Sequence, residues 1–329
     1  MLSVVIATYN RCELLIQLLR GLAAQDLSAD KFNVIVVDDG SLVPVRPAIE
    51  AITWPFAITI IEQKNAGQAA ARHAGLEAVM SSDVVVIVDD DMSVPPHFLS
   101  AHLAYHERGY DVVLGHIRPS LELQKKPLFE RFHTAQIERF AVDMRQHGVT
   151  IRGANFFTGN VSFRSAAYFR VGGFDRSLAQ SEDRDLGIRL ELDGAKLVFA
   201  EDAYTINGSD HTSLDGWLRR SFRYGIYDSR IAAKYPKVRY VDPWQFLEHA
   251  NVAAKPLFAL AVVAPPVAHR LSRLAMSLAA ELDARGQEDL ALKGTTIAYG
   301  LEYFSGVREE AGSLRGAMDG FRTYLRKKG

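Results

Sequence analysis

The 329-residue sequence contains a single cysteine, Cys12. One cysteine cannot form a disulfide within the chain, and this one lacks the spaced Cys and His partners of a structural zinc site. A reducing compartment fits this composition best. We therefore predict a cytoplasmic protein, and we leave open a position at the inner face of the membrane.

Long apolar runs are also missing. The most apolar later stretch, Pro256–Pro266, is shorter than the roughly 20 residues that a spanning helix needs, and prolines interrupt it. The apolar start, Leu2–Thr8, follows no basic segment and is too short for a signal peptide, so it is predicted to be a strand. These lengths argue against integral membrane insertion. Peripheral membrane contact of Pro256–Pro266 and its packing against other helices both stay open.

An excess of charge of one sign is the third absence. Lys and Arg number 38 against 39 Asp and Glu, which gives a net charge of −1. No global attraction to nucleic acid is expected, and we predict no nucleic-acid partner. With 48% hydrophobic and 23% charged residues, the composition is that of a folded globular protein and excludes disordered, collagen-like and coiled-coil classes.

Apolar runs rich in Val and Ile alternate with helical patterns as far as Gly115, which predicts βα units and a largely parallel sheet. The expected strands are Leu2–Thr8, Asn33–Val37, Ala57–Glu62, Val84–Val88 and Val112–Gly115. A long helix is expected over Lys125–Gln146, and short strands around Asn155–Phe163 and Lys196–Phe199. From about Asp242 onward the pattern predicts helices joined by Gly and Pro.

Polar residues follow four of the expected strands. In an open sheet of this kind, ligands bind beyond the carboxyl ends of the strands, so these residues are the candidate site. The four segments are Thr8–Arg11, Asp38–Ser41, Lys64–Gly67 and Asp89–Asp91.

Three of these segments can each be interpreted on their own, and two of them point to phosphate or metal chemistry. The carboxylates of Asp89–Asp91 repel one another, and a divalent cation bridged to phosphate oxygens would relieve this; a solvated acidic turn is the alternative. Asp38–Ser41, taken alone, favours a turn in which Asp caps and Gly supplies a positive φ. Gly67 precedes a helix start, where free amides and the helix dipole attract phosphate, although a plain surface helix would have the same sequence.

A further acidic group, Glu182–Asp185, begins a predicted helix. A carboxylate at a helix N-terminus stays ionised and can accept a proton from a hydroxyl group. Helix capping by Ser181 and Glu182 is the alternative interpretation. His211, in a polar loop, is by itself typical of a surface residue.

Together these segments resemble the family 2 glycosyltransferases with the GT-A fold. Matching motifs follow the family's order over roughly the first 230 residues: Val4–Arg11, Val34–Ser41, Asn65–Gly67 with Ala71-Arg72, Val88–Asp91 with Pro95, Gly159-Asn160, Gly172–Asp175 and Glu182–Gly187 with Arg189 and Gly194. The resemblance implies an α/β fold of GT-A type, a Rossmann-like and mostly parallel central sheet with flanking helices, followed by a helical C-terminal region. We expect a GT-A domain over residues 1–235, with a nucleotide-binding half at 1–117 and an acceptor and catalytic half at 118–235. Residues 236–329 are then the helical appendage.

The resemblance also implies roles for individual residues. Binding of the nucleotide sugar falls to Thr8, Tyr9, Arg11, Asp39, Asn65, Gly67, Arg72, Asp89 and Asp90. Asp91 is implied as the direct ligand of Mg or Mn, with Asp89 and His211 as further ligands. Asp183 is implied as the catalytic base, with Glu182 next and Asp185 structural. The sequence departs from the family's pattern at Met92, where a further acidic residue is common, and at His73, where an Asn is common.

The implied reaction is inverting transfer of a sugar from a nucleotide sugar, most often a UDP-sugar in this family, to an acceptor hydroxyl. The acceptor is a saccharide, a lipid-linked glycan or a small metabolite, and no motif specifies it or an oligomeric state. A catalytically silent sugar-nucleotide-binding subunit is the non-enzymatic alternative, which the intact Asp89, Asp91 and Asp183 argue against. A sugar nucleotidyltransferase would need a Gly-rich loop after the first strand, and Ala7–Arg11 contains no glycine.

Overall fold

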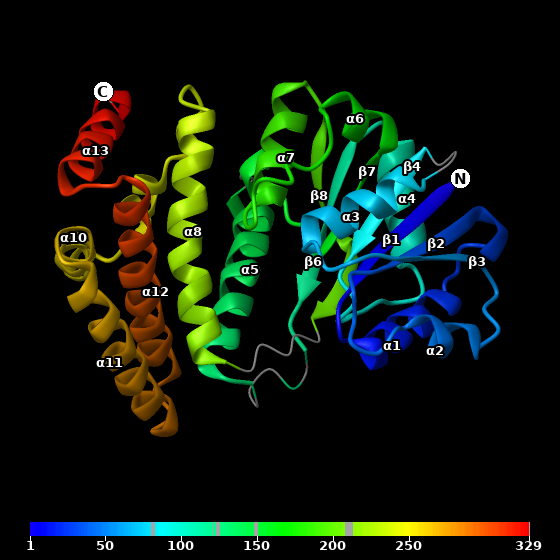
Figure 1. Ribbon diagram of the computed structural model, residues 1–329, viewed down its shortest axis with the longest axis horizontal. Coiled ribbons are helices and arrows are strands. Elements are labelled where there is room, and N and C mark those ends of the chain that lie inside the picture. Colours follow the sequence, from blue (N-terminus) through cyan, green and yellow to red (C-terminus); the bar gives the residue numbers. More distant parts are fainter. Residues whose placement is uncertain (80–82, 121, 123–125, 148–150, 208–212, 329) are drawn as a thin grey trace. The chain divides into compact units, whose positions relative to one another are not determined.

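The computed structural model describes residues 1–329 except 80–82, 121, 123–125, 148–150, 208–212 and 329. The chain divides into two compact units (Figure 1). The first contains residues 1–121 and 136–210, and the second contains residues 122–135 and 211–329. The functional boundaries expected at residues 117 and 235 stay predictions.

The first unit is built on an eight-stranded mixed sheet with the order β3-β2-β1-β4-β7-β6-β8-β5. The strands are β1 (Leu2–Thr8), β2 (Phe32–Asp38), β3 (Ala57–Glu62), β4 (Val84–Val88), β5 (Met92–Ser93), β6 (Val112–Arg118), β7 (Asn160–Arg164) and β8 (Leu197–Asn207). β1 to β4 are mutually parallel, and β6 and β8 are also parallel to each other. β7 is antiparallel to both of its neighbours, β4 and β6. The five expected strands are thus confirmed, and the sheet is parallel over β1 to β4 and mixed beyond them.

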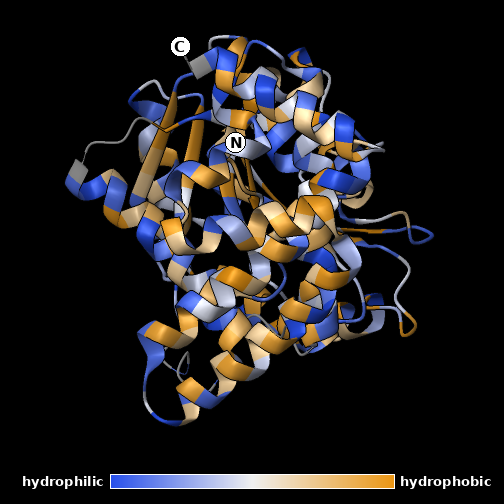
Figure 2. Ribbon diagram, turned by 90° about the vertical axis from the view of Figure 1, so that its left-hand side faces the viewer, coloured by the Kyte–Doolittle hydropathy of each residue, from blue (hydrophilic) through white to orange (hydrophobic). Residues whose placement is uncertain are grey.

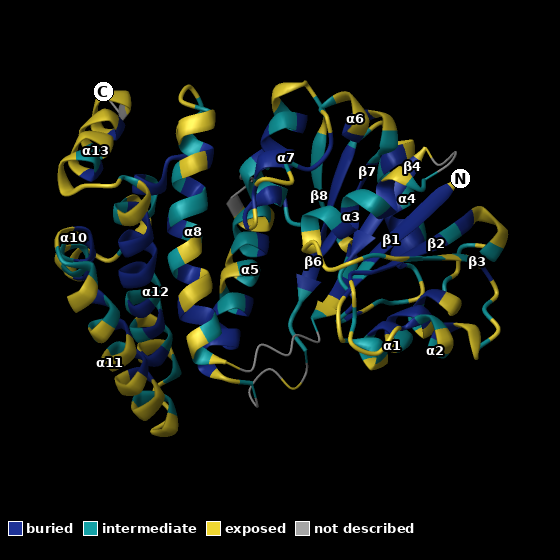
Figure 3. Cartoon of the chain, viewed as in Figure 1, coloured by how far each residue is buried: buried dark blue, intermediate teal, exposed yellow. Residues whose placement is uncertain are grey.

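Helices cover both faces of this sheet. They are α1 (Cys12–Ala23), α2 (Arg46–Glu50), α3 (Gln68–Glu77), α4 (Phe98–Glu107), α6 (Ser165–Arg170) and α7 (Glu182–Leu192). Successive side chains of a strand point to opposite faces. Val4 and Ile6 therefore join the core beneath α1 and α4, whereas Val5 joins the core beneath α3 and α7. Both layers are apolar, which explains why the central strands are Val-rich runs buried along their length (Figure 3).

The second unit is helical, as the sequence predicts from about Asp242 onward. It contains α8 (Leu214–Lys234), α9 (Phe246–His249), α10 (Lys255–Val263), α11 (Pro265–Ala284), α12 (Glu288–Glu310) and α13 (Leu314–Lys328). The first residues of α5 (Leu128–His147), up to Ala135, also belong to this unit. Its core is rich in aromatic rings, among them Trp244, Phe258 and Phe304.

The apolar stretch Pro256–Pro266 forms most of α10 and the beginning of α11. Phe258, Ala261 and Val262 are buried in the helical core, so this stretch packs mainly against other helices. None of the described helices is long and apolar enough to cross a membrane.

Candidate active site

The carboxyl ends of four parallel strands lie side by side in the sheet. Thr8 of β1 is paired with Asp38 of β2, and Asp38 is paired with Glu62 of β3. β4 lies on the other side of β1. The fold therefore brings the four predicted polar segments to one edge of the sheet.

The segments after β1 and β4 are joined by hydrogen bonds and ion pairs. The Thr8 hydroxyl donates to Asp90 Oδ2 at 2.7 Å. The Arg11 guanidinium contacts Asp90 Oδ1 at 3.3 Å and Asp91 Oδ2 at 3.1 Å. Burial raises the pKa of Asp90, while the Thr8 hydrogen bond and the Arg11 charge act in the opposite direction. One arginine thus balances part of the charge of two adjacent carboxylates.

The turn after β2 holds its carboxylates with backbone N–H groups. Asp38 accepts from the amides of Ser41 (2.9 Å) and Val45 (3.1 Å), and Gly40, just before Ser41, has a φ of 81°. This is the capping turn that the segment alone favours. A Cβ on Gly40 would lie 2.7 Å from the Asn65 backbone nitrogen, so only glycine fits there.

Asp39 ties the β2 turn to the loop before α3. Its Oδ1 accepts from Gln63 Nε2 at 2.7 Å and from the Ala66 amide at 2.9 Å, and its Oδ2 accepts from the Gly67 amide at 2.8 Å. Asn65 and Gly67 are exposed, as is Tyr9. Asp39 therefore fixes the shape of a surface loop at the candidate nucleotide site.

Arg72, on α3, connects two carboxylates that are far apart in the sequence. Its guanidinium contacts Asp89 Oδ1 at 2.6 Å and Glu182 Oε1 at 3.2 Å, and its side chain is only 3% exposed. Burial alone would lower the pKa of Arg72, but the facing Asp89 and Glu182 carboxylates outweigh it and raise that pKa. The end of β4 and the start of α7 therefore meet at one buried cation.

Asp183 lies directly beside this bridge, in the first turn of α7. Ser181, the residue before the helix, has a left-handed φ of 62°, which is uncommon outside glycine and turns the chain sharply into the helix. Asp183 Oδ1 accepts from the Arg184 amide at 2.7 Å. Desolvation by the surrounding protein, and then the neighbouring Glu182 carboxylate, raise the pKa of Asp183 to about 7. Asp183 as a residue is half-buried.

The third carboxylate of this helix start is held quite differently. Asp185 is fully buried, and its Oδ2 accepts from Arg189 Nε at 2.8 Å and Nη2 at 2.6 Å. Arg189 also donates to the Val171 carbonyl at 2.7 Å. These contacts support the prediction that Asp185 is structural.

The donor chemistry of the β4 turn fits a divalent cation. In the part of the chain that the structure describes, no three His, Cys, Asp or Glu side chains are arranged to hold a metal on their own. Mg²⁺ is commonly held by one or two carboxylates together with substrate phosphates, so Asp89 and Asp91 suffice. The Asp89 side chain is 29% exposed and reachable from solvent. The predicted ligand His211 lies outside the described residues.

Two residues have contacts at the site that the sequence did not assign to them individually: Asn10, inside the predicted segment Thr8–Arg11, and Gln63, outside the predicted segments. Asn10 has a φ of 57°; its amide donates to Ser41 Oγ at 2.8 Å and its Oδ1 accepts from the Leu42 amide at 2.7 Å, which joins the β1 and β2 turns. Gln63, which binds Asp39, comes one residue before the predicted segment Lys64–Gly67. Its position directly after β3 could have identified it from the sequence, because the other candidate residues also follow strands.

The two departures from the family pattern have structural explanations. His73 Nδ1 contacts the Tyr168 hydroxyl at 2.7 Å, and the same hydroxyl accepts from the Phe174 amide at 3.1 Å. His73 thus supports the turn that contains Phe174. Met92 is buried and contacts the Thr205 hydroxyl through its sulfur at 3.5 Å.

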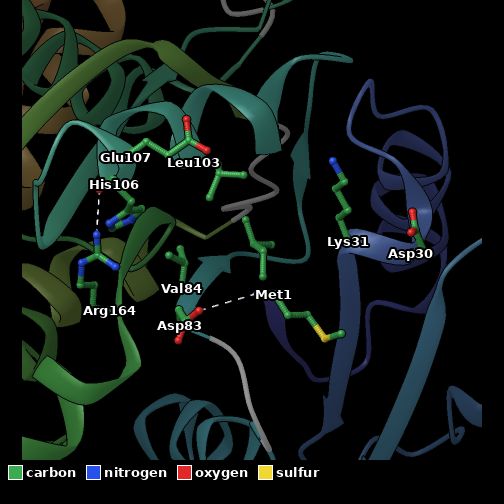
Figure 4. Close-up of a pocket in the computed structure, with 10 residues that line it drawn as sticks. Met1, Asp30, Lys31, Asp83, Val84, Leu103, His106, Glu107 and Arg164 are labelled. Atoms are coloured by element: carbon green, nitrogen blue, oxygen red, sulfur yellow. Dashed lines mark hydrogen bonds and ion pairs between the residues drawn. The ribbon is translucent and has the colours of Figure 1, made fainter.

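A cavity of about 410 Å³ lies elsewhere, where the strands begin (Figure 4). Leu2 and Val84, at the starts of β1 and β4, line it together with His106 and Arg164. None of the predicted site residues lines it. This hollow is therefore separate from the candidate active site.

The comparison with protein families places the site in context. A model described as Glycosyl transferase family 2 matches residues 3–168, half of the chain. The validoxylamine A glucosyltransferase of Streptomyces hygroscopicus subsp. jinggangensis is 29% identical over 232 residues, covering 63% of this chain and 55% of that protein. The pre-mycofactocin glycosyltransferase of Mycobacterium tuberculosis is 29% identical over 213 residues, covering 62% and 43%. The chain thus spans about half the length of the curated relatives it matches.

Solved structures share the architecture. A mannosyltransferase from Pyrobaculum calidifontis, PcManGT, in complex with GDP-Man and Mn²⁺, superimposes with a TM-score of 0.59 at 18% identity, covering 90% of this chain and 86% of that one. Residues 1–349 of S. aureus TarS in complex with UDP give a TM-score of 0.51 at 17% identity, covering 90% of each chain. At these identities the likeness concerns the fold. It confirms the expected GT-A fold with a helical C-terminal region.

Proposed function

Because the chain belongs to glycosyl transferase family 2, we propose that it transfers a sugar from a nucleotide sugar to an acceptor hydroxyl with inversion at the anomeric carbon. The observation that carries this proposal is the bridge from Asp89 through Arg72 to Glu182, with Asp183 beside it. It joins a carboxylate suited to the donor's metal and phosphates to a carboxylate suited to proton transfer. A protein that only binds sugar nucleotides has no use for the second.

In the proposed reaction, the acceptor oxygen attacks the anomeric carbon from the side opposite the diphosphate. A new carbon–oxygen bond forms as the bond to the diphosphate oxygen breaks, so one displacement inverts the configuration. Asp183 takes the proton of the attacking hydroxyl, and its pKa of about 7 suits a base near neutral pH. Glu182, held by Arg72, is less available for this step.

The donor side is assigned to the remaining predicted residues. Thr8, Tyr9, Arg11 and Asp39 would hold the base and ribose, and the exposed residues Asn65 and Gly67 lie before the N-terminus of α3, where phosphate is favoured. Arg11, Asp90 and Asp91 already form one charged group there. Asp91 and Asp89, with His211, would hold Mg²⁺ or Mn²⁺, which when bound neutralises charge on the departing diphosphate.

A UDP-sugar is the proposed donor. Among proteins of similar fold, TarS has been solved with UDP and the mannosyltransferase with GDP-Man and Mn²⁺. A GDP-sugar is therefore the first alternative to test. For the acceptor, we propose a hydroxyl of a saccharide, a lipid-linked glycan or a small metabolite, met in the cytoplasm or at the inner face of the membrane.

The experiment that tests the proposal measures nucleotide release from a panel of UDP-, GDP- and dTDP-sugars with Mg²⁺ or Mn²⁺. Release of a nucleoside diphosphate is expected from one donor class, and it should be lost in Asp183→Asn while nucleotide binding remains. Incorporation of a nucleotide from a triphosphate would instead indicate a nucleotidyltransferase. Nucleotide-sugar binding with no release in the presence of any acceptor would indicate a silent binding subunit.

A further inference from the structure

The C-terminal helix α13 buries one face and exposes an apolar row beside it. Ala317 and Tyr324 are buried against the aromatic core of the second unit. Leu314, Met318 and Leu325 are 36%, 45% and 48% exposed. Their spacing of four and eleven residues places them within about 40° of one another around the helix. They form a narrow apolar row, which we call the α13 row.

Basic side chains flank the α13 row on its solvent side. At helical spacing, Arg322, Arg315 and Arg326 follow the row around the helix, before the buried face is reached. Arg315 is 93% exposed and Arg322 is 61% exposed. Asp319 is the acidic residue of this helix and pairs with Arg322 at 2.9 Å and with Arg315 at 4.0 Å. The helix contains five basic residues and this one aspartate; Lys327 also pairs with Asp242 at 3.6 Å, so α13 keeps a smaller but clear excess of positive charge.

This excess distinguishes α13 from α11, another helix of the same unit. α11 also exposes apolar side chains, at Val267, Leu274 and Leu278. Its sequence contains two arginines and two acidic residues, so its charges balance. The combination of an exposed apolar row and an excess of cations is therefore a property of α13.

We propose that α13 is a docking surface for an anionic lipid bilayer, lying flat in the headgroup layer. The α13 row would insert among the upper acyl carbons while its arginines contact lipid phosphates, the arrangement of an interfacial amphipathic helix. This surface differs from the stretch Pro256–Pro266, whose apolar side chains are largely used in the core. Figure 2 shows how hydrophobic and hydrophilic residues alternate along the helical ribbons of the chain.

The proposal deepens the proposed function, because it would place a transferase at the surface where lipid-linked acceptors are found. It is tested without donor or acceptor, so that vesicle binding and sugar transfer can fail separately. The full chain is floated with vesicles of phosphatidylcholine alone and with vesicles that contain about 30% phosphatidylglycerol. At least tenfold stronger binding to the anionic vesicles is expected, with loss of binding at about 1 M salt, where the Debye length falls to about 3 Å.

Substitutions locate the contact. Met318→Glu and Leu325→Glu should each weaken binding roughly tenfold or more, since a charge replaces an inserted apolar side chain. Arg315→Gln and Arg326→Gln should each weaken it about fivefold. Leu290→Glu is the matched control, because Leu290 is 48% exposed like Leu325 but lies near the beginning of α12. Its binding should equal that of the unaltered chain.

Four results would overturn the proposal: no vesicle binding, equal binding to neutral and anionic vesicles, insensitivity to salt, or unchanged binding in both arginine variants. The arginine variants keep the test meaningful if a row variant folds poorly, because the exposed Arg315 side chain makes no part of the core. Analytical ultracentrifugation tests the alternative that the α13 row binds a second copy of the chain instead of a bilayer. Self-association that Met318→Glu abolishes, without lipid binding, would make the α13 row an interface between copies and would contradict the proposal.

Discussion

The acidic turns after β2 and β4 hold their carboxylates in different ways. After β2, Asp38 and Asp39 accept hydrogen bonds mainly from backbone N–H groups of the same turn and of the loop before α3. After β4, the carboxylates face arginine side chains, with Arg11 on two of them and Arg72 on the third. Both turns end parallel strands at the same edge of the sheet.

This difference separates folding from chemistry. A backbone N–H group cannot leave its acceptor unless the turn itself changes, so Asp38, which accepts from two such groups, is committed to the fold. Asp39 combines the same kind of hydrogen bond with its proposed contact to the nucleotide. An arginine side chain can move, and a cation or a phosphate can replace it as the partner of a carboxylate. We call Asp89, Asp90 and Asp91, together with Arg11 and Arg72, the arginine-held group. Through Glu182, which contacts Arg72, this group extends to the candidate base Asp183. We therefore expect substitutions after β2 to cost stability, and substitutions in the arginine-held group to cost activity.

The largest effect on activity is expected at Asp183, where the arginine-held group meets the start of α7. Asp183→Asn removes the proton acceptor and should lower the rate of transfer by a factor on the order of 10² to 10⁴. In the unaltered protein, the rate should fall as the pH drops below about 7, because a protonated Asp183 cannot act as a base. Initial rates between pH 5 and 9 measure this. Nucleotide binding by calorimetry is the control and should change little.

The same substitution should have the opposite effect on stability. The folded pKa of Asp183 is raised from 3.8 to about 7, so the folded chain binds this proton more tightly than the unfolded chain. The stabilising contribution is complete below about pH 4 and is lost as the pH rises through about 7. Asp183→Asn should therefore unfold at a higher urea concentration than the unaltered protein at pH 8, with the difference vanishing toward pH 4. Lower stability of the variant at pH 8 would contradict the raised pKa.

The second effect concerns the β4 turn itself. Asp91→Asn should weaken binding of a nucleoside diphosphate in the presence of Mn²⁺ by at least about tenfold, because a neutral amide replaces an ionised ligand. The urea midpoint should stay the same or rise slightly, since one of three adjacent carboxylates is removed. Titration calorimetry with and without Mn²⁺ measures the first quantity. Equal binding in the variant and the unaltered chain would remove Asp91 from the proposed ligands.

Much of the fold could be predicted from the sequence, because the signals are local. Val84–Val88 is a continuous apolar run, and such a run between polar punctuation is typical of a strand buried on both faces. The antiparallel insertion of β7 between β4 and β6 could not be predicted, since it depends on pairing between residues about 75 positions apart. Helix boundaries differ by a few residues from those predicted. The helix α5, for example, spans Leu128–His147, whereas Lys125–Gln146 was expected.

The candidate residues could be predicted by their position after strands, but their partners could not. Asp38, Asp39 and Asp89 have the same local context in the sequence, a pair of aspartates after an apolar run. Whether a backbone amide or an arginine faces each carboxylate depends on loops that only the folded chain brings together. The contact between Arg72 and Glu182, across 110 positions, has no local signal at all.

The third prediction tests the folding role of the β2 turn. Asp38→Asn should destabilise the protein by about 2 kcal/mol, because the buried Val45 N–H and the partly buried Ser41 N–H lose a charged acceptor and the new amide NH₂ faces one of them. Urea unfolding followed by circular dichroism measures this. Asp83→Asn is the matched control, since its side chain is 82% exposed and its contact with the N-terminus is 3.9 Å long, and it should change stability by less than about 0.5 kcal/mol. If Asp38→Asn and Asp83→Asn were equally stable, Asp38 would not stabilise the fold, and the distinction drawn between the β2 and β4 turns would be wrong.

The smallest effect is a shift of the pH profile at the centre of the arginine-held group. The positive charge of Arg72 lowers the pKa of Asp183, against the stronger effects of desolvation and of Glu182. Removing that charge in Arg72→Gln should therefore move the midpoint of the rate profile upward, by about one pH unit or less. Arg72→Lys keeps the charge and should leave the midpoint close to that of the unaltered protein, although a single ammonium group cannot span both Asp89 and Glu182 as the guanidinium does. A purely structural Arg72 would lower the rate in both variants at every pH and leave both midpoints in place.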